Sequence, residues 1–339
     1  MKRPGVRLRD IAEEAGVSIS TVSLVLNDKA LDGNVRISEP TIQYVQRIAR
    51  EMNYFPNLSA RAMLSGRTTI VGLILIEIKY SSSQLPLVQG ISEILKQEHY
   101  SLATGILTEG DLNLELEEMR VMIQKGFDCL IVEPSEALLE QVADTPEFYN
   151  HSDRIILINR PSVAGLASVK VDNEAGGYLA TRHLLELGHR RIAFGGDHCS
   201  VDEAYIRSLL SSTLDRFRGY LRAMDEFEAD PIAVEDAREV VDLLPQGVTA
   251  AYCSRSWGAV DLLGVCLDRG IRVPETLAII GQDDAREKRV VRPRISTVNM
   301  RTQEVGRLAA RMALEVIEGE IPESVVLEPE LIVRESTQV

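Results

Sequence analysis

The sequence is poor in aromatic side chains and cysteine, and it has no long apolar segment. Phe, Trp and Tyr make up only 5% of the 339 residues, so we expect an interior built mainly from aliphatic side chains. The four cysteines are far apart and form no CxxC pair, which argues for ordinary reduced thiols rather than a metal or redox motif. No stretch reaches the ~18 apolar residues of a membrane span, and no apolar run follows Met1-Lys2-Arg3 as in a signal peptide. The sequence therefore predicts a cytoplasmic protein with no membrane partner.

Motifs typical of enzymes are also missing. The sequence has no HExxH, no GxSxG and no Walker loop. Acidic pairs such as Glu117-Glu118 fit solvated helix faces better than acid–base catalysis. We therefore predict no catalytic residue, no metal site and no cofactor.

Charge is distributed unevenly along the chain. The whole sequence carries 37 Lys and Arg against 51 Asp and Glu, a net charge of −14 that by itself argues against nucleic acid. Residues 1–67, however, hold 10 Lys and Arg against 7 Asp and Glu, a net charge of +3. A mildly basic head on an acidic body is expected where one end of a chain meets phosphates.

The first 54 residues predict three short helices. Leu8, Ile11, Ala12 and Ala15 recur at helical spacing, and Gly16 ends that segment. A second helix is expected from its N-cap Ser18 to about Asn27, and a third after its N-cap Ser38, with the buried stripe Ile42, Val45, Ile48, Ala49 and Met52. Two short helices around a glycine turn are typical of a helix-turn-helix, whose second helix enters the major groove of DNA.

The pattern changes after Pro56. Residues 57–66 favour one short helix of marginal stability, and from Thr68 onward apolar strands alternate with helix-period segments. The expected strands are Ile70–Ile78, Leu102–Leu107, Cys129–Val132, Ile155–Ile158, Ile192–Phe194, Val248–Cys253 and Leu277–Ile280. Such alternation predicts parallel sheets covered by helices, and some 270 residues of it exceed a single sheet. Two α/β lobes are therefore expected.

Several motifs carry a family resemblance that extends over nearly the whole chain. They are Ile11-Ala12 through Asn27, Asn53-Tyr54-Phe55-Pro56-Asn57, Val171-Asp172-Asn173-Glu174, Ile280-Gly281-Gln282-Asp283-Asp284 and the ending Leu331-Ile332-Val333-Arg334-Glu335-Ser336. Together they resemble the LacI/GalR family of bacterial transcription regulators. The resemblance implies an all-α helix-turn-helix head (1–56), a hinge helix (57–67) and an α/β two-lobed periplasmic-binding-protein-like domain with parallel sheets (68–339). Lobe 1 would comprise about 68–169 and 299–328, and lobe 2 about 170–298 and 329–339.

The resemblance also implies which head residues meet DNA. Base edges would be read by Ile19, Ser20 and Leu24, and phosphates held by Ser18, Thr21, Ser23, Asn27 and Arg36. The hinge residues Asn57, Ala60, Arg61 and Met63 would enter the minor groove, with Met63 as the apolar wedge. Arg36 also fits a solvated loop charge, and Met63 a core or interface residue. Leu24 departs from the polar or basic residue usual in the family; leucine cannot make a bidentate bond to guanine but can touch a thymine methyl.

Candidate effector contacts follow from the same resemblance and from the rule that ligands bind beyond the carboxyl ends of strands. They are Tyr80, Arg216, Tyr252, Trp257 and Asp283. Arg216 and Asp283 can fork onto hydroxyls or a carboxylate, or can instead form a structural salt bridge. Trp257, the only tryptophan, fits a stacking platform and a core residue at a helix start equally well. This region lacks the aromatic and amide residues usual in the family, so a carbohydrate effector is an expectation from the family alone.

The expected function is a homodimeric repressor that binds near-palindromic double-stranded operator DNA under control of a small-molecule effector. A sugar-binding protein serving a transporter is the first alternative, but it would need an export signal and leaves the head unexplained. An enzyme would instead require turnover of the bound ligand.

Overall fold

The computed structural model describes residues 6–26, 37–54, 62, 66–77, 84–108, 112–141, 144–195, 211–255 and 257–338. The chain divides into two compact units, residues 1–68 and 69–339. Each unit has hydrophobic clusters of its own, so each is described separately.

Within the described residues, the first unit is a small bundle of the helices α1 (Leu8–Ala15), α2 (Ile19–Leu26) and α3 (Glu39–Glu51). Gly16 ends α1 with a left-handed backbone (φ 66°), a conformation that glycine adopts without the steric cost other residues meet. The eight buried side chains that hold the bundle together are Ile11, Ala12, Val22, Val25, Ile42, Val45, Ile48 and Ala49. They come from all three helices, so the head has one continuous, small aliphatic core.

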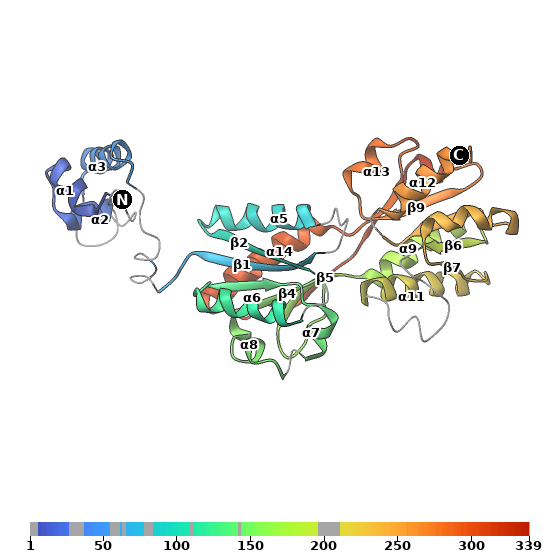
Figure 1. Cartoon of the computed structure of the whole chain (residues 1–339), viewed down its shortest axis with the longest axis horizontal. Helices are drawn as coiled ribbons and strands as arrows, with labels where there is room; N and C mark the ends of the chain where they lie inside the picture. The colour runs from blue at the N-terminus through green and yellow to red at the C-terminus, as the bar shows by residue number, and fades with distance from the viewer. Residues whose placement is uncertain are drawn as a thin grey trace. The chain divides into compact units, whose positions relative to one another are not determined.

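The second unit contains two six-stranded sheets, and we name the first of them with its helices lobe 1 (Figure 1). Its strand order is β11 (Val325–Leu327), β5 (Ala167–Val171), β4 (Ile155–Ile158), β3 (Cys129–Val132), β1 (Ile70–Glu77) and β2 (Ser101–Thr108), and all neighbours are parallel. One face is covered by α5 (Gln84–Gln97) and α14 (Thr302–Glu318). The other carries α6 (Leu112–Gln124), α7 (Glu136–Gln141) and α8 (Pro146–Tyr149), and the turn η2 (Ser152–Arg154) precedes β4.

The second sheet and its helices form lobe 2. The strand order is β12 (Glu330–Ile332), β10 (Ser296–Asn299), β9 (Ala278–Gln282), β8 (Ala250–Cys253), β6 (Ile192–Gly195) and β7 (Ile232–Val234); only β12 runs antiparallel to its neighbour. One face packs on α9 (Asn173–Glu186) and α11 (Ser211–Glu226). The opposite face packs on η3 (Ala237–Gln246) and α12 (Gly258–Asp268). The short helix α13 (Arg286–Val290) follows β9, and η4 (Glu335–Thr337) lies near the end of the chain.

Glycines allow two pairs of helices to approach closely. A Cβ built on Gly177 of α9 would lie 1.9 Å from the carbonyl oxygen of Arg216 in α11, and one on Gly219 would lie 2.0 Å from that of Glu174. In lobe 1, a Cβ on Gly90 of α5 would lie 2.1 Å from the carbonyl oxygen of Gln303. No side chain fits at such distances, so backbone meets backbone at both crossings.

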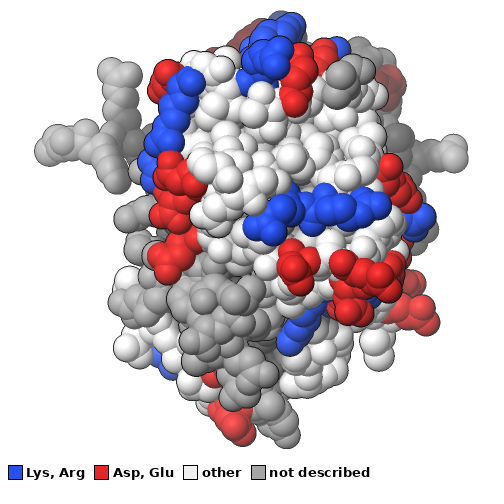
Figure 2. Space-filling view, turned by 90° about the vertical axis from the view of Figure 1, so that its right-hand side faces the viewer, with Lys and Arg blue, Asp and Glu red and all other residues white. Residues whose placement is uncertain are grey.

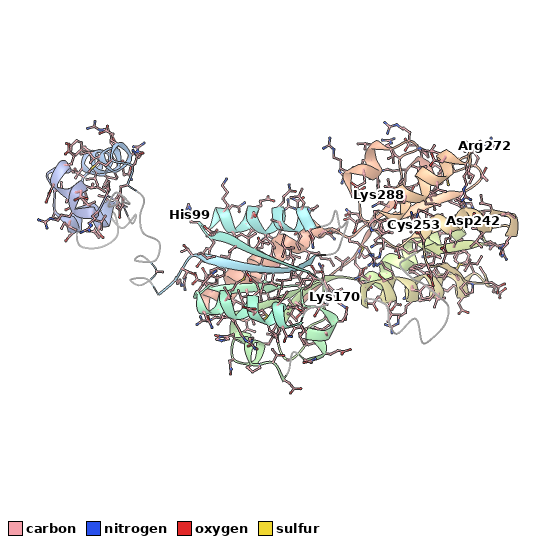
Figure 3. All side chains as sticks on the ribbon, viewed as in Figure 1. His99, Lys170, Asp242, Cys253, Arg272 and Lys288 are labelled. Carbon is pink, nitrogen blue, oxygen red and sulfur yellow. The ribbon has the colours of Figure 1, made fainter. Side chains whose placement is uncertain are left out.

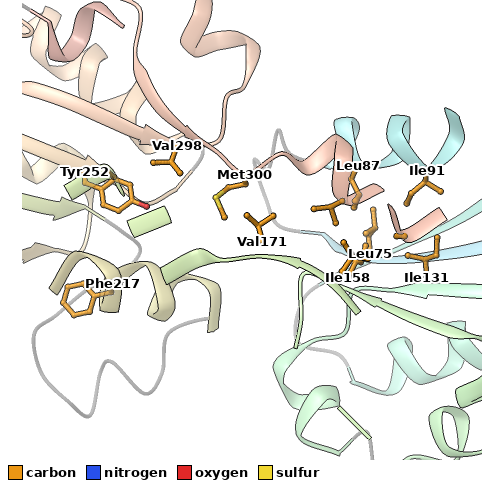
Figure 4. Close-up of a cluster of buried hydrophobic side chains, with 14 of the residues drawn as sticks. Leu75, Leu87, Ile91, Ile131, Ile158, Val171, Phe217, Tyr252, Val298 and Met300 are labelled. Carbon is orange, nitrogen blue, oxygen red and sulfur yellow. The ribbon is translucent and has the colours of Figure 1, made fainter. Parts of the chain in front are cut away.

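Aliphatic and aromatic side chains of the second unit pack into a cluster with members in both lobes (Figure 4). Leu75 and Ile158 belong to it in lobe 1, and Phe217 and Tyr252 in lobe 2. On the face of the second unit shown in Figure 2, basic and acidic side chains alternate around uncharged surface. The mixed signs on this face contrast with the net positive charge of residues 1–67.

Candidate functional site

Helix α2 presents a polar start and an exposed face. The backbone N–H of Thr21 donates to Ser18 Oγ at 3.0 Å, and the two hydroxyl oxygens lie 2.9 Å apart. Ser18 and Ser20 are exposed, and Ile19 keeps 49% of its surface accessible. Opposite them, Val22 and Val25 of α2 are fully buried against α1 and α3. The residues predicted to meet DNA from α2 thus lie on the side of the helix that the core leaves uncovered.

Some predicted contacts lie outside the described residues. They are Asn27, Arg36, Asn57, Ala60, Arg61, Met63 and Tyr80. Their roles in DNA and effector binding remain predictions. Ser23 and Leu24 are described and are partly exposed.

In lobe 2, Arg216 is fixed where β8 ends. Its guanidinium donates to the carbonyl oxygen of Ser254 at 2.6 Å, to that of Ser212 at 2.9 Å and to Ser212 Oγ at 3.1 Å. Asp283 follows β9 directly, with a left-handed backbone (φ 63°). Burial raises the pKa of Asp283, although Lys288 and Arg216 act in the opposite direction. No ion pair joins Arg216 to Asp283 in the described part of the chain, so each keeps polar capacity for another partner.

Lys288 is a residue that sequence reasoning missed. It is fully buried in α13, and its ammonium donates to the carbonyl oxygen of Gln282 at 2.7 Å (Figure 3). Burial lowers its pKa, while the nearby carboxylate of Asp283 favours the charged form. The amine of a buried lysine therefore lies near Asp283 at the carboxyl end of β9.

The structure places Tyr252 in the core of lobe 2. It has no exposed surface, and its hydroxyl donates to Gln282 Oε1 at 2.7 Å. This bond fixes the amide of Gln282, whose buried Nε2 has no hydrogen-bond partner among the described residues. Trp257 is partly exposed at the N-cap of α12, four residues after the end of β8 at Cys253.

Lobe 1 has a matching polar group at the carboxyl ends of β3 and β4. Glu133 follows β3 and is 7% exposed, and Asn159 follows β4 with a left-handed backbone (φ 56°). Asn159 Nδ2 donates to Glu133 Oε1 at 3.0 Å, and Arg160 donates to the carbonyl oxygen of Pro134 at 2.9 Å. Sequence reasoning missed this group. The rule that selected Asp283 would have found it, because each residue follows an expected strand.

Burial makes Glu133 a source of pH dependence. Desolvation raises its pKa above the usual 4.5, against the opposing effects of Arg160 and Asn159. The folded protein therefore favours the protonated form of Glu133. The contribution of this preference to the free energy of unfolding is lost as pH rises from 4.5 through the pKa of Glu133 in the folded protein. The side chain of Glu133→Gln does not titrate, so the variant lacks this loss. We therefore expect the free energy of unfolding of the variant, relative to that of the natural protein, to be greater at pH 8 than at pH 5. Urea unfolding of both proteins at pH 5 and at pH 8 measures this difference in the free energy of unfolding. A difference that is the same at both pH values contradicts the expectation.

Within the described residues, no group of three or more His, Cys, Asp and Glu side chains is arranged to hold a metal ion. Over the same ranges, no helix combines the length and apolarity of a bilayer crossing. Cys129, Cys253 and Cys266 are buried free thiols, and burial raises the pKa of Cys129 to about 12.

A helix-turn-helix head followed by a two-lobed α/β unit defines the class of DNA-binding transcription regulators. Comparison with known proteins agrees. Residues 7–57 match the model of bacterial regulatory proteins of the lacI family, and residues 181–337 match that of the periplasmic binding protein-like domain. The transcriptional regulator RegA of Clostridium saccharobutylicum is 31% identical over 97% of this chain and 98% of its own. The protein belongs to the LacI family of bacterial transcription regulators, which are not enzymes.

Solved structures agree on the fold. The Lac repressor dimer bound to operator and the anti-inducer ONPF matches 99% of this chain and 100% of its own with a TM-score of 0.81, at 20% identity. The complex of the transcriptional regulator CelR with cellobiose matches 98% of this chain and 100% of its own with a TM-score of 0.66, at 25% identity. The predicted fold class, an all-α head followed by an α/β domain with parallel sheets, is confirmed.

Proposed function

We propose that this protein is a homodimeric repressor of the bacterial cytoplasm that binds near-palindromic operator DNA and is controlled by a small-molecule effector. The observation that carries the proposal is the separation of two units with separate cores. One offers a helix face to DNA, and the other offers polar groups at the carboxyl edges of two parallel sheets. An effector bound at those edges would change operator affinity by favouring one arrangement of the lobes. The operator-bound Lac repressor dimer supports the assembly.

We propose a carbohydrate as the effector. Arg216 and Asp283 in lobe 2, and Glu133 and Asn159 in lobe 1, supply the charged and amide groups that bind vicinal hydroxyls. Trp257 adds an apolar ring, while Tyr252 acts indirectly by orienting Gln282. The CelR–cellobiose complex supports this class of ligand. Tyr80 and the hinge residues keep the roles predicted above.

The effector site predicts a selective effect of Asp283→Asn. Asparagine tolerates the left-handed backbone but cannot offer a carboxylate, so a sugar loses a charge-assisted hydrogen bond. We expect at least about tenfold weaker binding of any sugar that raises the melting temperature of the natural protein. Operator binding without ligand should be unchanged. Asp242→Asn, at an exposed ion pair with Arg269, is the matched control; equal sugar affinity in both variants contradicts the assignment.

Selection from random DNA tests the proposed function. Full-length protein should enrich one near-palindromic site, and its affinity for that site should fall steeply as salt rises. Protein lacking residues 1–67 retains the whole second core and should bind no DNA but keep its ligand response. Enrichment of no sequence over random DNA contradicts the proposal.

A further inference from the structure

Helix α2 has an unusual composition for a helix that reads DNA. From Val17 to Leu26 its side chains are only aliphatic groups and hydroxyls: there is no Arg, Lys, Asn, Gln, Asp or Glu. Bidentate hydrogen bonds to guanine or adenine need a guanidinium, an ammonium or an amide, so α2 cannot make them. Hydroxyls can bond to any base and discriminate weakly.

Two aliphatic residues of α2 take no part in the head core. Val22, Val25 and Leu26 pack against α1 and α3, whereas Ile19 and Leu24 do not belong to that cluster. Ile19 is 49% exposed, and Leu24 is partly exposed.

The two residues share one side of the helix. At 3.6 residues per turn, the four residues Ile19, Ser20, Ser23 and Leu24 fall within an arc of about 140° on the side away from the core. This side is continuous with the polar start of α2 at Ser18. Helix α2 therefore presents two aliphatic side chains on the side from which base-reading helices usually present hydrogen-bonding groups.

We infer that Ile19 and Leu24 recognise thymine, through contact with its C5-methyl group in the major groove. This inference rests on the proposed operator binding. The thymine methyl is the only apolar group on a base edge of that groove, so it alone complements such side chains. Each half-site therefore contains thymines that are read by burial of a methyl group rather than by hydrogen bonds.

Deoxyuridine provides the test, because it keeps the hydrogen-bonding groups of thymine and lacks only the methyl. The operator selected from random DNA is prepared with thymine or with deoxyuridine throughout both half-sites. Loss of one contacted methyl should weaken binding about fourfold, so a symmetric pair should weaken it by about tenfold or more. Deoxyuridine placed only outside the half-sites should have no effect.

Variants link the effect to the two residues. The double variant with Ile19→Ala and Leu24→Ala should bind the thymine and deoxyuridine operators with nearly equal affinity. Each single variant should reduce the ratio of the two affinities, whereas Ser20→Ala should keep the ratio of the natural protein. Neither aliphatic residue is in the core, so the variants should remain folded. Equal affinity of the natural protein for both operators, with its preference over random DNA intact, overturns the thymine inference alone. Failure to select any site overturns the proposed function, and the inference with it.

Discussion

Gly177→Ala is expected to destabilise the second unit by about 3 kcal/mol, at the upper end of the usual cost of overpacking. The added Cβ would lie 1.9 Å from the carbonyl oxygen of Arg216, a backbone atom that cannot rotate away. Helix α11 must therefore shift, and Arg216 shifts with it. We expect a lower urea midpoint, together with a weaker response to any sugar that binds the natural protein.

Gly264→Ala is the matched control for this substitution. Gly264 also lies within a helix of lobe 2, but a Cβ there meets nothing within 4 Å. Alanine should stabilise that helix by up to ~1 kcal/mol, because it loses less backbone entropy on folding than glycine. Equal loss of stability in both variants would show that the close crossing of α9 and α11 is not the cause.

Ile11→Ala is expected to weaken operator binding at least tenfold while leaving the second unit intact. Ile11 is fully buried among the eight core residues of the head. Truncating a buried isoleucine costs about 2–5 kcal/mol, which is comparable to the whole stability that a core of this size supplies. The head should therefore be largely unfolded, and operator affinity should fall at least tenfold. Anisotropy of a labelled operator measures this fall.

Ile19→Ala makes the same chemical change on the exposed side of the head. It should leave head stability within about 0.5 kcal/mol of the natural value, since surface substitutions rarely cost more. The thermal transition of the second unit should be unchanged in both variants, because its core is separate. A head that survives Ile11→Ala as well as Ile19→Ala would contradict the core described above.

The fold was predictable wherever the apolar residues of a segment followed the spacing of a helix or formed the continuous run of a buried strand. Strands β3 and β4 have the bounds expected from their apolar runs, and the helices of the head follow their spacing and Gly16. Strands β5, β7, β10, β11 and β12 were not expected. They have three to five residues, each includes a partly exposed side chain, and pairing with distant segments holds them in place.

The candidate effector site was predictable in position but not in detail. Asp283 was found because it follows a clear strand. The burial of Tyr252 was not evident, since strands covered on both faces read as continuous apolar runs that do not reveal which face a side chain takes. Lys288 was missed because a lysine in a polar segment suggests solvent; in the structure it is buried, with its side-chain carbons close to Gly281.

Coupling between the two units is the central claim, and operator affinity with and without ligand measures it directly. The selected operator is titrated with full-length protein in the presence and absence of a sugar that raises the melting temperature of the protein. We predict at least a fivefold change in the dissociation constant, as is typical of allosteric coupling. An unchanged constant with every sugar that stabilises the protein would contradict the account.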